Sequence, residues 1–158
     1  LNMSKELAIE IKKCQDHAIE LRSQGYGCAQ CVLMALSDKI GLHEKQAARM
    51  AAAYGSGFAG SGGICGVISI LGIAEGLLIS GYGPEDKSKA IWNTKDLLEK
   101  FKVSNGGHHL CRDLKGKEDA KKCPDLIKEG IELFLTAHPE AINSKKGLLA
   151  EIKEALHS

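Results

Sequence analysis

Hydrophobic residues recur at helical spacing along most of the chain. Between Ser4 and Gln24 the apolar positions are three or four residues apart, with charged and amide side chains between them, which is typical of an amphipathic helix. The same spacing predicts further helices over about 28–40, 44–54, 65–79, 85–101 and 124–136, and from Pro139 to about Leu156. No run alternates apolar and polar residues as a half-buried strand would. We therefore expect an all-α fold.

The length and composition predict a single domain. A chain of 158 residues, with 44% apolar and 26% charged residues, can bury a core of its own. We expect residues 1–158 to form one bundle of about six or seven helices.

Charge and hydropathy argue against two kinds of partner. The chain has 21 basic and 20 acidic residues and only 4% aromatic residues, so it offers neither a basic field for phosphates nor a stacking surface for bases. The longest apolar run, residues 64–79, contains Glu75 and is too short to cross a membrane. We expect neither a nucleic-acid partner nor a membrane, and the first residues carry no export signal, which favours the cytoplasm. The oligomeric state stays open.

Three of the six cysteines are distinguished by their place in the predicted helices. Cys14 lies in the apolar stripe of the first helix, where we expect it to act as a small packing residue. Cys28 and Cys65 each follow a glycine-bearing turn and stand at a predicted helix start. Exposed amides and the helix dipole lower the pKa of a thiol at such a position.

Two further cysteines border a charged segment that is predicted to be a loop or a short helix. Arg112 follows Cys111, and Lys121 and Lys122 precede Cys123. Nearby cations also favour the thiolate. We therefore treat Cys28, Cys65, Cys111 and Cys123 as a functional set, the alternative being four unpaired thiols.

Other residues could belong to the same chemistry. Cys31 follows Cys28 in a Cys-x-x-Cys motif at a helix start, where it is either a resolving thiol, a second metal ligand or a core residue. His108 and His109 lie just before Cys111. Imidazole with thiolate suits zinc, and thiolates alone suit zinc or an iron-sulfur cluster, whereas solvated loop histidines are the alternative.

Two other features carry weaker signals. Residues 55–60 match the glycine pattern of a dinucleotide-binding loop, but a predicted helix rather than a strand enters them, so we do not expect nucleotide binding. Glu75 is the single charge in an apolar helix. It either lies at an exposed edge or sits near the cysteines and tunes them.

The cysteines and their neighbours resemble the C_GCAxxG_C_C family of proteins, to which a redox role is ascribed. The matching segments are 26–33, the glycine loop leading into 63–66, 111–114 and 123–126, and the resemblance covers about residues 20–135. It implies that Cys28, Cys65, Cys111 and Cys123 are the family set and that Cys14 and Cys31 are additional. The chain departs from the family pattern at Val67, where Ala is usual, and at Ile70, where Gly is usual.

Together these observations predict a redox-active protein with an unidentified redox partner. Cys28 would attack a disulfide, which would make the protein a thiol-disulfide oxidoreductase, and Cys65, Cys111 and Cys123 would resolve the product or form a second pair. The alternative is a metal-binding module in which the same four cysteines hold zinc or an iron-sulfur cluster. A third interpretation is a ligand-binding or partner-binding bundle with incidental cysteines.

Overall fold

The computed structural model describes residues 3–116, 121–143 and 156, and this part of the chain is helical without a named strand. The expected all-α fold is confirmed, with seven α-helices in the described residues. The α-helices are α1 (Met3–Ser23), α2 (Cys28–Leu36), α3 (Glu44–Met50), α4 (Gly66–Ile79), α5 (Lys87–Ser104), α6 (Cys111–Leu114) and α7 (Cys123–Ala137). Short 3₁₀ helices occupy Ser37–Lys39, Pro84–Asp86 and Pro139–Asn143.

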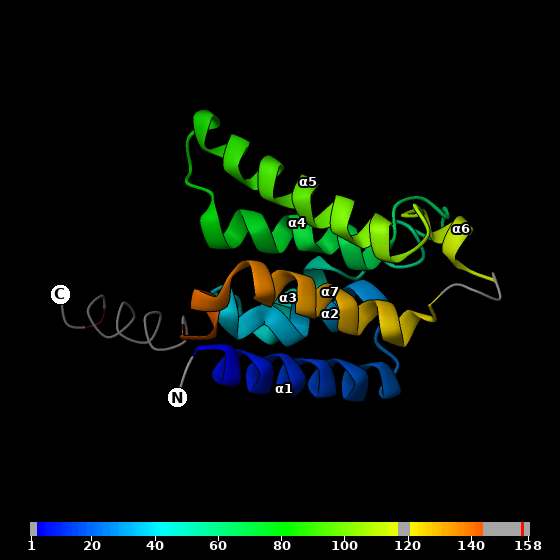
Figure 1. The fold of residues 1–158 in the computed structure, drawn as a ribbon, viewed down its shortest axis with the longest axis horizontal. Coiled ribbons are helices and arrows are strands. Elements are labelled where there is room, and N and C mark those ends of the chain that lie inside the picture. The colour runs from blue at the N-terminus through cyan, green and yellow to red at the C-terminus, as the bar shows by residue number, and fades with distance from the viewer. Residues whose placement is uncertain (1–2, 117–120, 144–155, 157–158) are drawn as a thin grey trace.

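The helices are arranged around α2. Figure 1 shows α4 and α5 as an antiparallel pair on one side, α1 on the other, and α2, α3 and α7 between them. Seven of the nine residues of α2 are buried, because α1, α3, α4 and α7 all pack against it. This apolar helix therefore forms the centre of the core.

Several helix boundaries differ from those predicted. The second helix tightens into a 3₁₀ turn at Ser37, and α3 ends at Met50 instead of reaching Tyr54 because the chain turns there toward the glycine loop. The α5 helix begins at Lys87, after a 3₁₀ turn, and continues to Ser104. Of the last predicted helix, the structure has a 3₁₀ helix at Pro139–Asn143, and most of the remainder lies outside the described residues.

Glu75 occupies neither of the two positions expected for it. Its side chain is fully buried, and its Oε1 lies 2.7 Å from Nε2 of His138, the residue that ends α7. Asn93 of α5 donates from Nδ2 to Glu75 Oε2 at 3.4 Å. The charge therefore serves to join three helices inside the core.

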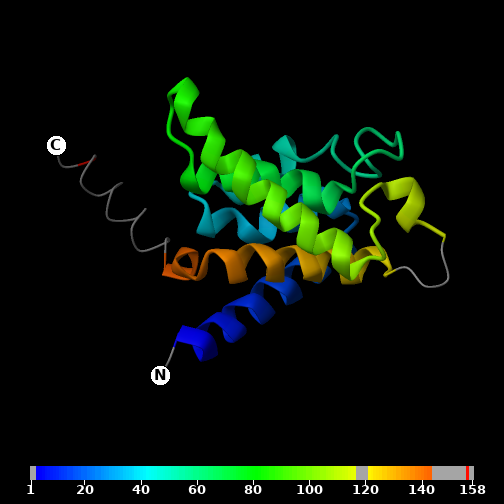
Figure 2. The same ribbon diagram turned by 45° about the horizontal axis from the view of Figure 1, so that its top comes forward.

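One end of the bundle gathers the starts of four helices. Figures 1 and 2 show α6, the loop before α4 and the first turns of α4 and α7 at the same end, opposite the start of α1. The α2 helix also begins there. The four cysteines that the sequence analysis groups together belong to these helix starts, so this end of the molecule holds the candidate site.

Among the described residues, no helix is both long and apolar enough to cross a membrane.

Candidate functional site

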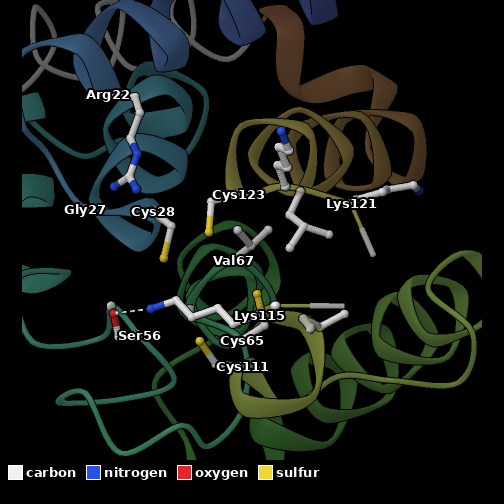
Figure 3. A pocket seen from close by; sticks show the side chains of 16 residues that line it. Arg22, Gly27, Cys28, Ser56, Cys65, Val67, Cys111, Lys115, Lys121 and Cys123 are labelled. Carbon is white, nitrogen blue, oxygen red and sulfur yellow. Dashed lines mark hydrogen bonds between the residues drawn. The ribbon is translucent and has the colours of Figure 1, made fainter. Parts of the chain in front are cut away.

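The four cysteines predicted to act together line a single cavity of about 490 Å³. Cys28 is the first residue of α2, Cys65 caps α4, Cys111 is the first residue of α6 and Cys123 is the first residue of α7. In Figure 3 their sulfur atoms point into the same space, although they come from four separate segments of the chain. All six cysteines of the protein are free thiols in this structure.

Backbone hydrogen bonds place Cys65 beside Cys111. The Cys65 N–H donates to the carbonyl oxygen of His109 at 2.8 Å, and the Cys111 N–H donates to the carbonyl oxygen of Gly63 at 2.7 Å. These bonds flank an antiparallel bridge between Ile64 and Leu110. The chain segment before α4 is therefore fastened to the segment before α6, and two thiols are held at one wall of the cavity.

The glycine loop that precedes Cys65 has an unusual backbone. Ser56, Phe58 and Ala59 adopt positive φ angles of 53°, 69° and 52°, a region that residues with a β-carbon rarely occupy. The loop is tight, because a β-carbon at Gly57 would lie 2.4 Å from the backbone nitrogen of Gly63. The glycines thus shape a compact turn before Cys65.

Gly66 brings the start of α4 against the start of α2. A β-carbon at this position would lie 2.6 Å from the carbonyl oxygen of Tyr54 and 3.0 Å from Sγ of Cys28. Only a residue without a side chain fits there unless the neighbours move. The Cys28 thiol consequently packs against the residue that follows Cys65.

Burial reverses the pKa shifts expected for two of the thiols. Burial of the Cys65 side chain, which is 5% exposed, raises the pKa of this thiol to about 12, and the nearby Cys28 and Cys111 add to the rise. The N–H groups of Val67 and Ile68 act in the opposite direction but are outweighed. Burial also raises the pKa of Cys111, although Lys115 lowers it. The expectation of a lowered pKa at these two cysteines is therefore wrong.

The charged residues that line the cavity are all basic. They are Arg22, Lys115, Lys121 and Lys122, and no Asp or Glu occurs among the described residues of the lining. Figure 3 shows the Lys115 side chain extending between the thiols toward Ser56, and its Nζ donates to Ser56 Oγ at 3.3 Å. The sequence pointed to Lys121 and Lys122 but not to Arg22 or Lys115. The position of Lys115, one helical turn after Cys111, is the signal that could have identified it.

A comparison with known proteins identifies a family that the chain resembles. The family described as "Putative redox-active protein (C_GCAxxG_C_C)" matches residues 26–136, which contain all four cavity cysteines. The chain belongs to this family. No curated protein and no solved structure matches the chain.

The C_GCAxxG_C_C pattern is varied at Val67, and the structure shows how the larger side chain is accommodated. Val67 is fully buried and lines the cavity. A β-carbon at Gly130 of α7 would lie 2.4 Å from Cγ1 of Val67. Gly130 therefore provides the space that Val67 occupies, and α4 still packs against α7. Ile70 is also fully buried.

The two additional cysteines of this family member lie outside the cavity lining. Cys31 is fully buried in the core, its Sγ lies 3.6 Å from the carbonyl oxygen of Tyr26, and burial raises its pKa to about 11. Cys14 is buried in the core, and burial raises its pKa to about 11 as well. Both positions are those of packing residues.

The histidines that precede Cys111 do not join the thiols. His108 and His109 are half-buried and are not among the residues that line the cavity. The contribution of His109 is its backbone oxygen, which accepts from Cys65. Within the described ranges, no three Cys, His, Asp or Glu side chains stand close enough together to bind one metal ion.

Proposed function

We propose that Cys28, Cys65, Cys111 and Cys123 form a redox centre that works by thiol–disulfide exchange. The observation that supports this function most strongly is the convergence of four cysteines, from four helix starts, on one cavity with basic walls. Thiols brought together in this way are suited to disulfide formation, and cations favour the thiolate, which is the attacking species.

We give Cys28 the first step because its thiol is the more accessible one. Cys28 is half-buried and lies at the start of α2, whereas Cys65 is nearly inaccessible. The Cys28 thiolate attacks one sulfur of a substrate disulfide, and a mixed disulfide forms as the substrate S–S bond breaks. The departing thiolate takes a proton from water.

Cys65 is suited to resolve the mixed disulfide. Cys65 follows Ile64, which forms the bridge to Leu110, and it precedes Gly66. The sulfur of Cys28 packs against Gly66. Cys65 loses its proton, attacks the Cys28 sulfur and releases the second substrate thiol. The protein dithiol loses two electrons, the substrate disulfide gains them, and an external thiol reductant reverses the oxidation.

Cys111 and Cys123 form the second pair in this proposal. The charge of Cys123 is the strongest thiol contribution to the raised pKa of Cys111. Cys111 also neighbours Cys65 through the backbone bonds between their segments. A second dithiol at this place would pass electrons to the first pair by the same exchange.

Single cysteine substitutions test the mechanism. Reduced protein is assayed for turnover of 2-hydroxyethyl disulfide, an uncharged substrate, with a thiol reductant present. Cys28→Ser should abolish turnover, and Cys14→Ser, at a buried cysteine outside the cavity, should leave it unchanged. Unchanged turnover in Cys28→Ser would overturn the role of Cys28.

A second candidate function uses the same residues as metal ligands. Four thiolates are a donor set for zinc or an iron-sulfur cluster, and four basic residues at the cavity would offset the negative charge of such a group. No three of the four cysteines stand close enough together to bind one ion in this structure, so Cys28, Cys65, Cys111 and Cys123 would hold the group only after the helix starts move toward one another. A cluster would supply one-electron transfer, and zinc would supply cross-linking of the helix starts.

Metal content distinguishes the two candidates. The protein is purified without oxygen, and its zinc, iron, sulfide and free thiols are measured before and after mild oxidation. Reversible loss of four thiols without stoichiometric metal supports the disulfide centre. About one zinc, or two to four irons with matching sulfide, supports the metal-binding function.

A further inference from the structure

Positive charge is concentrated at the cavity although the chain as a whole is almost neutral. The net charge of the 158 residues is +1, yet the charged lining residues comprise three lysines and one arginine. Lys121 is paired with Glu129 at 2.8 Å, so its charge is largely neutralised. The other three cations of the lining are Arg22, Lys115 and Lys122.

Those three cations have no acidic partner among the described residues. The guanidinium of Arg22 donates to the carbonyl oxygen of Tyr26 at 3.1 Å, and Lys115 donates to the hydroxyl of Ser56. Both acceptors are uncharged. Lys122 forms no ion pair within the part of the chain that the structure describes. Within the described residues, the charges of these three cations are therefore not neutralised by an ion pair.

The cavity also has apolar walls and a size suited to a small molecule. Val67, Leu114 and Leu126 line it, and its volume of about 490 Å³ lies in the range of small-molecule sites. The starts of α2, α4 and α7 meet there, and the positive ends of these helices add to the field of the cations. The Cys65 thiol, 5% exposed, lies in the same lining.

We infer that the cavity binds a small disulfide that carries carboxylate groups, together with the thiols formed from it. This inference rests on the proposed thiol–disulfide exchange and names its substrate class. The carboxylates pair with Arg22, Lys115 and Lys122, and the carbon chain lies against the apolar wall. The substrate S–S bond is then presented to Cys28, whose thiolate forms a new S–S bond while the substrate bond breaks and one carboxylate-bearing thiolate leaves.

The charge of the substrate is the quantity to vary. Three small disulfides of similar length are compared at low salt: 3,3′-dithiodipropionate with two negative charges, 2-hydroxyethyl disulfide with none and cystamine with two positive charges. We expect kcat/KM to be highest for the dianion and lowest for the dication. Added salt should reduce the rate for the dianion and leave the neutral substrate unaffected, because salt screens exposed charges.

Charge substitutions locate the effect at the cavity. Lys115→Gln/Lys122→Gln should lower kcat/KM for 3,3′-dithiodipropionate about tenfold, because the field of clustered charges changes capture of an anion by that order. The same variant should lose less of its rate with 2-hydroxyethyl disulfide, because that substrate carries no charge for the two lysines to attract. Lys128→Gln removes one charge from an exposed position on α7 outside the cavity, so it controls for the loss of a surface charge away from the site.

A sulfur-free analogue separates binding from redox chemistry. Suberate has the chain length and charge of 3,3′-dithiodipropionate, with a CH₂–CH₂ unit in place of the S–S unit, and its binding is measured by calorimetry. Binding that is lost in Lys115→Gln/Lys122→Gln supports the inference. Equal rates for the three disulfides would overturn the inference about charge but leave the exchange mechanism standing. Suberate binding without turnover of any disulfide would overturn both the exchange mechanism and the substrate role.

Discussion

At the scale of single residues, burial at Cys65 outweighs its position at a helix start. Interaction with a helix dipole is worth about 0.3–2 kcal/mol. The rise in the pKa of Cys65 from 9.0 to about 12 corresponds to about 4 kcal/mol in the opposite direction. Cys65 is therefore a poor initial nucleophile in the resting protein, and its reactivity depends on a change in its surroundings, such as a mixed disulfide at Cys28.

We predict that Cys65 is the slowest of the four cavity thiols to react with iodoacetamide. With a pKa of about 12, the thiolate fraction at pH 8 is on the order of one in ten thousand. Site-specific alkylation is followed by mass spectrometry, and the rate at Cys65 should still increase above pH 10. The half-buried Cys123, measured in the same digest, is the internal reference. Equal rates for the two at neutral pH would contradict the buried state of Cys65.

We predict opposite effects of alanine at two glycines of the same helix. Gly66→Ala should lower the free energy of unfolding by about 2 kcal/mol, because its β-carbon meets the backbone of Tyr54 and the sulfur of Cys28. Gly76→Ala should raise it by up to about 1 kcal/mol, since nothing lies within 4 Å of that β-carbon and glycine weakens a helix interior. Urea unfolding measures both, and a loss of stability in Gly76→Ala would contradict the open space there.

The identity of the cysteine set could be predicted from the sequence, but the state of each thiol could not. Glycine turns and predicted helix starts mark Cys28 and Cys65, and the charged segment marks Cys111 and Cys123 at its borders. These signals depend on neighbouring residues only. The burial of Cys65 depends on how α2, α4 and α6 meet. That arrangement is set by contacts between distant segments, which leave no local pattern.

At the scale of elements, two contacts fix α4 against α7. Near the cavity, Gly130 makes room for Val67, and at the far end His138 pairs with Glu75 inside the core. Both contacts join residues that are 63 positions apart. Helical periodicity predicted α4 and α7 from their own residues, but it carries no information about which residues face each other. The pairing of Glu75 was therefore beyond the sequence analysis.

We predict a pH-dependent contribution of His138 to stability. The hydrogen bond to Glu75 raises the pKa of His138, with further contributions from the charges of Glu75 and Glu140 and opposition from burial. Because the folded pKa exceeds the unfolded value, the stabilisation is complete below about pH 6.5 and is lost as the pH rises through the folded pKa. His138→Gln should cost about 3–5 kcal/mol at pH 6, since the Glu75 carboxylate loses its charged partner.

Urea unfolding at pH 6, 7 and 9 measures this effect. The difference between the wild type and His138→Gln should shrink as the pH rises. The double variant Glu75→Gln/His138→Gln removes both charges from the pair and should show a smaller and pH-independent loss. A constant difference between wild type and His138→Gln at all three pH values would mean that His138 is not charged in the folded protein.

At the scale of the whole molecule, the core and the candidate site occupy different parts of the bundle. The largest fully buried side chains, such as Phe101, Phe134 and Ile131, belong to the helices and do not line the cavity. The four cysteines lie at the helix starts, at one end. This separation suggests that the fold is stabilised by apolar burial, which the composition predicted, and that the cavity chemistry is not required for folding.

We predict that the protein folds without its four cavity cysteines. Each Cys→Ala change at positions 28, 65, 111 and 123 removes a single sulfur atom from a partly or fully buried site, comparable to one methylene at about 0.8 kcal/mol. The quadruple variant should therefore lose about 3 kcal/mol in total, similar to the loss of about 2–5 kcal/mol expected for the single core substitution Ile131→Ala. Far-UV circular dichroism and urea unfolding, with reductant and chelator present, measure both variants.

A cooperative transition in the quadruple variant agrees with a redox centre attached to a bundle that folds without it. An unfolded quadruple variant beside a folded Ile131→Ala variant would show that the four cysteines hold the structure together, and would favour a structural metal at the cavity over thiol–disulfide exchange.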